Sequence, residues 1–183
     1  RAMKELNANL LIHPVVGMTK PGDVNHFTRA RCYKNVMQEY PERSAFLSLL
    51  PLAMRMGGPK ETLLHAIIRK NYGCTHLIVG RDHAGPGLNS KNEPFYGPYE
   101  AQNILEKYQD ELEIEMVPFK FMVFIPKSAK FKAIDDVDQN EDYKTLSGTE
   151  LRQLLDEGKG IPEWFTFKSV AHELERSNPP LAK

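Results

Sequence analysis

The stretch THLIVGRDHAGPG at residues 75–87 decides how we interpret the fold. Its apolar half, 75–79, is short, rich in β-branched residues and followed by glycine, which is typical of a buried strand that runs into a loop. Open α/β sheets bind ligands at that end of their strands. In the loop, Arg81, Asp82 and His83 lie between glycines, so the backbone can approach an anion closely while polar side chains surround it. The same residues also fit a tight turn in which Arg81 and Asp82 pair with each other.

Strand-like and helix-like segments alternate on both sides of this stretch. We expect strands over residues 10–16, 45–50 and 75–79 with one more within 113–126, and helices over 27–40, 59–73 and from Pro98 onward. This order predicts an α/β fold with a parallel sheet, right-handed crossovers and helices on both faces.

The part of the chain after this alternation has a different character. Residues 127–144 are charged and irregular. Ser147 and Glu150 then have the spacing of a capping box, which predicts the start of a helix. A final helix carries Val170 and Leu174, so we expect a small helical part at this end.

Composition narrows the class of partner. Lysine plus arginine equals aspartate plus glutamate, at 24 each in 183 residues, so no overall field favours nucleic acid or an anionic membrane. No apolar run reaches the roughly 20 residues of a membrane span. Cys32 and Cys74 form no CxxC pair, which argues against a zinc site and a disulfide framework. We therefore expect a cytoplasmic chain with neither nucleic-acid nor membrane partners and no protein-bound metal.

A few residues outside the loop are further candidates. Lys20, Arg29 and Arg152 could contact an anion, the last because it lies one turn into a capped helix. Ordinary turn chemistry explains Lys20 equally well, and a purely structural capping box explains the helix start near Arg152. His65, within the helix predicted at 59–73, is interpreted as a partly buried histidine whose hydrogen bonds are satisfied.

Motifs along nearly the whole chain resemble those of one enzyme family. They are LLIHPVVGMTKPGDV, AMRMGGPKETLLHAIIRKNYG, VGRDHAGPG, FYGPYEAQ, SGTELR and IPEWF, and their order is that of the ATP sulfurylase (sulfate adenylyltransferase) family. The resemblance implies a Rossmann-like nucleotidylyltransferase fold. It places a partial catalytic domain at residues 1–146 and a helical subdomain at 147–183. The implied reaction converts ATP and sulfate to adenosine 5'-phosphosulfate and pyrophosphate.

The resemblance also implies roles for individual positions. Those that match the ATP-binding positions are Gly80, Arg81, Asp82, His83 and Met122, the last through a backbone contact to adenine. Ala84 matches a residue whose amide binds sulfate, and Arg81 and His83 match catalytic positions. Mg²⁺ is expected with ATP, and a homo-oligomer is expected for the full-length protein.

One family signature has no counterpart in this chain. It is a stretch of glutamine, arginine, asparagine and proline before two histidines three apart, and it should lie just before Arg1. We therefore expect little activity from these residues alone. Two alternatives stay open. One is another nucleotidylyltransferase of this fold, acting on a phosphorylated acceptor, and the other is a noncatalytic module that binds ATP or forms oligomers.

Overall fold

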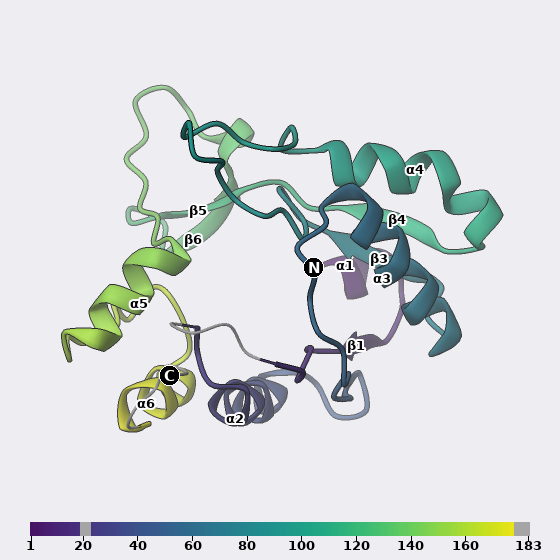
Figure 1. Cartoon of the computed structure of the whole chain (residues 1–183). Helices are drawn as coiled ribbons and strands as arrows, with labels where there is room; N and C mark the ends of the chain where they lie inside the picture. Colours follow the sequence, from purple (N-terminus) through teal and green to yellow (C-terminus); the bar gives the residue numbers. More distant parts are fainter. Residues whose placement is uncertain (19–22, 178–183) are drawn as a thin grey trace. The chain divides into compact units, whose positions relative to one another are not determined.

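A computed structural model describes residues 1–18 and 23–177, which form a mixed α/β structure (Figure 1). Internal contacts divide the chain into two compact units. The first unit combines the described parts of 1–53, 123–131 and the stretch from Gln139 onward, and the second combines 54–122 and 132–138.

The second unit is built on a parallel strand pair. Strand β3 (His76–Val79) pairs in parallel with β4 (Glu115–Pro118), and helices α3 (Pro59–Asn71) and α4 (Glu100–Leu112) pack against each other beside them (Figure 1). The core of this unit consists of Ala66, Val79, Ala101, Leu105 and Ile114. Because the predicted strand 75–79 lies in this pair, its carboxyl end delivers the loop of interest.

Local sequence explains both helices of this unit. Pro59 occupies the first turn of α3, where its missing N–H costs no hydrogen bond, and Gly73 follows the helix with φ +84°. In α4, the side-chain amide of Gln102 donates to the carbonyl oxygens of Val79 (2.9 Å) and Phe119 (3.1 Å). This helix therefore ties together the ends of the two parallel strands.

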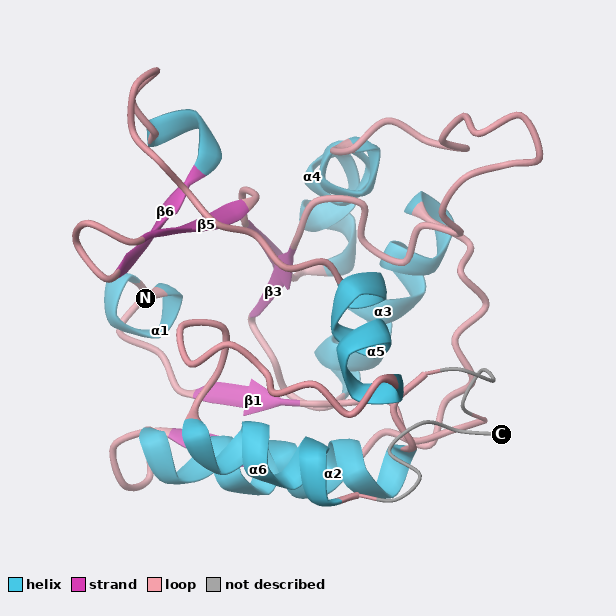
Figure 2. Ribbon diagram, turned by 90° about the vertical axis from the view of Figure 1, so that its left-hand side faces the viewer, coloured by secondary structure: helices cyan, strands magenta, loops and turns pink. Residues whose placement is uncertain are grey.

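The first unit contains a second parallel pair, β1 (Leu10–Ile12) with β2 (Ala45–Leu47). The helical segments of this unit are α1 (Ala2–Glu5), α2 (His26–Val36) with the 3-10 turn η1 (Met37–Glu39), α5 (Gly148–Asp156) and α6 (Lys168–Arg176). Helices α2 and α6 lie side by side (Figure 2). Ser147 and Glu150 form the predicted capping box, and the predicted final helix is α6.

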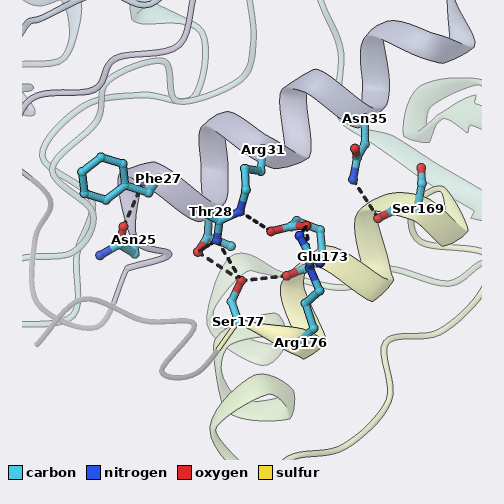
Figure 3. A network of polar contacts seen from close by, with 9 residues as sticks. All are labelled: Asn25, Phe27, Thr28, Arg31, Asn35, Ser169, Glu173, Arg176 and Ser177. Atoms are coloured by element: carbon cyan, nitrogen blue, oxygen red, sulfur yellow. Dashed lines mark hydrogen bonds and ion pairs between the residues drawn. The ribbon is translucent and has the colours of Figure 1, made fainter.

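A buried carboxylate joins α2 to α6 (Figure 3). Glu173 is 4% exposed and accepts from the guanidinium groups of Arg31 and Arg176. Ser177 donates to the backbone oxygen of Glu173 (2.8 Å), and Thr28 donates to the Ser177 hydroxyl (3.2 Å). Hydrogen bonds from the Arg31 guanidinium lower the pKa of Glu173, so this carboxyl group is charged inside the helix interface.

The prediction of one strand within 113–126 and irregular structure over 127–144 is wrong. Two strands occupy the first segment, β4 and β5 (Met122–Ile125), because β4 pairs with β3 whereas β5 pairs with a different strand. The second segment contains β6 (Lys130–Ala133), which pairs with β5, and the 3-10 turn η2 (Ile134–Asp136). The boundary between the two units crosses this strand pair.

The expected parallel pairing is present, but the strands of the described residues form three two-stranded sheets in place of one larger sheet. Proline limits the length of the β1–β2 pair. Pro14 interrupts the ladder after Ile12, and pairing resumes only as a single bridge between Val15 and Leu50. The fold is therefore α/β with small parallel sheets. Among residues 1–18 and 23–177, none of the helices has the length and apolar character needed to cross a bilayer.

Candidate functional site

The loop at residues 80–87 follows β3 and has an unusual backbone. Asp82 and Ala84 have φ of +52° and +54°, the left-handed region that costs a residue with a side chain about 1 kcal/mol or more. Hydrogen bonds hold it there: the Asp82 N–H donates to Pro98 (2.7 Å) and the Gly85 N–H to Asp82 (3.1 Å). A Cβ on Gly85 would lie 2.0 Å from Asp82 Oδ1, so any larger residue at this position would displace the Asp82 side chain.

A second loop, residues 54–58, meets the first one. The Gly58 N–H donates to the carbonyl oxygen of Ala84 (2.8 Å). Glu61, in the first turn of α3, accepts from the backbone N–H groups of Arg55 (2.7 Å) and Gly57 (2.8 Å). The two loops are therefore held by the start of one helix, within a single unit of the chain.

Two histidines connect α3 to the loop at 80–87. The Nδ1 of His65 lies 3.0 Å from the Nε2 of His83, and the rings meet edge to face at 81°. On its other side, His65 Nε2 lies 3.6 Å from Glu61 Oε1. His65 is 4% exposed and His83 is half-buried.

Both histidines are neutral near pH 7. Burial lowers the pKa of His65 to about 4, the nearby Arg69 and the His83 imidazole add to this effect, and Glu61 opposes it. Burial also lowers the pKa of His83, again with help from Arg69 and against Glu61. An uncharged pair at the base of the loop can orient a ligand by hydrogen bonding without adding charge.

The Arg81 guanidinium supplies the positive group of the loop. It lies 5.7 Å from the ring centroid of Phe121, within the range of a cation–π contact. The tight turn considered above required Arg81 to pair with Asp82. The Asp82 carboxylate instead lies against Gly85, so the Arg81 guanidinium can bind an anion.

The structure brings some predicted residues together and separates others. Arg81, His83 and Ala84 share the loop at 80–87, and Met122 directly follows Phe121, whose ring lies beside the Arg81 guanidinium. Lys20 lies outside the described residues.

Two of the weaker candidates have structural partners in the first unit. The Arg29 guanidinium donates to the Val15 carbonyl oxygen (2.9 Å). That of Arg152 binds the carboxylate of Asp23 (3.1 Å) and donates to the Thr149 hydroxyl (3.2 Å). Each guanidinium group therefore already makes a structural contact within its own unit.

His65 and Glu61 show what sequence reasoning missed. The expectation of a fully satisfied His65 is wrong, because its Nε2 is buried without a hydrogen bond. Glu61 is not among the residues predicted from the sequence, although two signals point to it: it is the third residue of α3, a favoured capping position, and it precedes His65 by one helical turn. Among the described residues, no group of three His, Cys, Asp or Glu side chains could hold a metal ion.

Comparison with known proteins identifies the family. A sequence model of the ATP-sulfurylase family matches residues 1–177. The chain belongs to the ATP-sulfurylase family. The resemblance drawn from the motifs is thereby confirmed.

Curated relatives of this family align with the whole chain. A sulfate adenylyltransferase of Yarrowia lipolytica is 57% identical over all of the chain and 32% of its own length. One of Saccharomyces cerevisiae is 55% identical over all of the chain and 36% of its own length. The chain thus spans about a third of these relatives.

A solved structure is similar over nearly the whole chain. It is described as the hexameric APS kinase from Thiobacillus denitrificans, with a TM-score of 0.75 and 27% identity. The match covers 98% of this chain and 32% of that one.

Proposed function

We propose that the chain is part of an enzyme that converts ATP and sulfate to adenosine 5'-phosphosulfate and pyrophosphate. Family membership supports the reaction, and one structural observation supports the site. The loop at 80–87 keeps Asp82 and Ala84 in left-handed conformations beside a cationic side chain. Strained backbone of this kind is concentrated at functional sites.

The reaction requires charge neutralisation and alignment more than covalent catalysis. A sulfate oxygen attacks the α-phosphorus in line, the new P–O bond forms, and the bond to the β-phosphate oxygen breaks as pyrophosphate leaves. In this proposal, Arg81 neutralises phosphate charge with its planar fork of donors. The N–H of Ala84 donates to sulfate, and the backbone of Met122 contacts adenine.

The other residues of the loop give it shape. Gly80 lets the backbone approach the phosphates closely, and Asp82 packs over Gly85 to maintain the left-handed turn. His83 binds ATP. Mg²⁺ arrives as part of the substrate, on the β- and γ-phosphates, where it screens their charge.

The finer architectural assignments also belong to this proposal. We infer a Rossmann-like nucleotidylyltransferase fold, with 1–146 in a catalytic domain and 147–183 in a helical subdomain. The hexameric description of the similar solved structure supports a homo-oligomer for the complete protein. The free cysteines, Cys32 and Cys74, suit a cytoplasmic location.

The test is sulfate-dependent release of pyrophosphate from ATP by the complete protein that contains this chain. Arg81→Ala should lower kcat/KM by about 100-fold, since it removes a group that stabilises charge in the transition state. Lys107→Ala is the matched control, because Lys107 is an exposed cation over the Tyr108 ring in the same unit (5.3 Å). It should retain wild-type kcat/KM.

Other outcomes would favour the alternatives. Pyrophosphate release that requires a phosphorylated acceptor and ignores sulfate would indicate another nucleotidylyltransferase. ATP binding without turnover in the complete protein would indicate a noncatalytic module.

A further inference from the structure

Glu61, His65 and His83 form a line of three side chains from the start of α3 to the loop at 80–87. The carboxylate lies 3.6 Å from His65 Nε2, and His65 Nδ1 lies 3.0 Å from His83 Nε2. All three residues belong to one unit, so these distances do not depend on how the units are arranged. In a line of this kind, the group at one end can determine which nitrogen of each ring carries the proton.

The orientation of the carboxylate is determined by the backbone. Both oxygens of Glu61 accept an N–H group, one from Arg55 and one from Gly57, and the side chain is almost completely buried. A carboxylate can only accept, so the side of His65 that faces it should carry a proton. A lone pair on Nε2 would face negative charge in a buried environment, where repulsion is strong.

The proton count then determines the rest of the line. Both imidazoles are neutral, and each neutral ring carries one N–H and one lone pair. With its proton on Nε2, His65 has a lone pair on Nδ1. The hydrogen bond between the rings therefore has His83 Nε2–H as its donor and His65 Nδ1 as its acceptor. Arg69, the other charged group that acts on both rings, also favours their neutral forms.

We propose that Glu61 and His65 are positioning residues that hold His83 in its Nε2–H tautomer and leave His83 Nδ1 as a hydrogen-bond acceptor. A phosphate oxygen without a proton cannot donate to such an atom. His83 therefore contacts ATP, in the function proposed above, through a ligand hydroxyl group or a water bound to the Mg²⁺ of the nucleotide. It neither donates a proton to the leaving group nor neutralises charge.

The tautomers are measured directly by two-bond ¹H–¹⁵N correlation NMR of the complete protein with ¹⁵N-labelled histidine, without ATP. Protonated and unprotonated ring nitrogens have well-separated shifts, and loss of signals in His65→Asn and His83→Asn assigns the two rings. We expect Nε2 to be protonated and Nδ1 unprotonated in both. A proton on Nδ1 of either ring would overturn the proposal.

Glu61→Gln tests the source of the preference. Without the negative charge, both rings should show averaged shifts from two tautomers, whereas a folded variant with wild-type shifts would overturn the role of Glu61. Glu100→Gln is the matched control. Glu100 also accepts a backbone N–H at a helix start, from Gly97 (2.7 Å), but it is exposed and belongs to α4. Its shifts should match the wild type.

Substrate kinetics give a second readout. If His83 contacts the nucleotide in this tautomer, Glu61→Gln should raise the KM for ATP by about tenfold, the effect of one hydrogen bond, with little change in the KM for sulfate. The tautomers themselves are measured without turnover. An inactive protein with the expected shifts would therefore contradict the proposed enzyme activity and leave the assignment of the two rings in place.

Discussion

Two buried titratable side chains, one in each unit, avoid an unpaired buried charge in opposite ways. Glu173 in the first unit and His65 in the second are each 4% exposed. Glu173 remains charged because Arg31 and Arg176 bind it, and its pKa is lowered. His65 becomes neutral because burial lowers its pKa to about 4. Pairing with two cations fastens helices together, whereas neutralisation leaves an oriented polar group beside a loop.

The largest expected difference between the two groups is in pH dependence. A base whose pKa falls on folding binds more protons in the unfolded chain, so stability decreases as pH falls from about 6.5 to about 4. The unfolding equilibrium constant should rise by about two orders of magnitude over this window. His65→Asn should remove most of this slope in denaturation curves, and His172→Asn, at an exposed position, should retain it.

Glu173 should act in a lower pH window. A carboxyl group with a lowered pKa contributes stability above its ordinary value of 4.5, and this contribution is lost as pH falls through the lower folded value. Loss of the slope above pH 4.5 in a Glu173→Gln variant would contradict the separation of the two windows.

A smaller effect is expected from the backbone of the loop. Gly85→Ala places a Cβ against Asp82 and should displace the turn, lowering kcat/KM of the complete protein by about 10- to 100-fold. Gly148→Ala is the matched control, because its Cβ would make only an ordinary 3.5 Å contact with Arg152. Equal activity of the two variants would show that the loop conformation is not needed for turnover.

The smallest expected effect concerns Glu173, the buried carboxylate that is paired with two cations. Arg31→Met removes one of the two cations on Glu173 and should lower the free energy of unfolding by about 1–2 kcal/mol, measured by urea denaturation, since a buried acceptor loses a charged donor. Arg1→Met breaks an exposed ion pair with Glu5 and should change the free energy of unfolding by less than about 1 kcal/mol. Similar changes in the free energy of unfolding of both variants would indicate that the buried ion pair of Glu173 stabilises the fold no more than an exposed one.

Part of this site was predictable because it depends on neighbouring residues. The strand before Gly80, the proline that opens α3 and the capping box at Ser147 follow from turn chemistry and periodicity. Those signals are local. The formation of two-stranded sheets and the additional strand at Lys130–Ala133 depend on which segments of the chain pack together. No local sequence pattern encodes that information.

The sequence by itself determined the alternation of strands and helices, the family and the loop of residues 80–87, because each of these is encoded in contiguous motifs. Only the tertiary structure decided that Glu61, His65 and His83 form one line, and that Arg29 contacts Val15 and Arg152 contacts Asp23. The physical reason is that burial and hydrogen-bond geometry determine the charge and tautomer of a histidine. Neither property exists until residues distant in the chain are packed together.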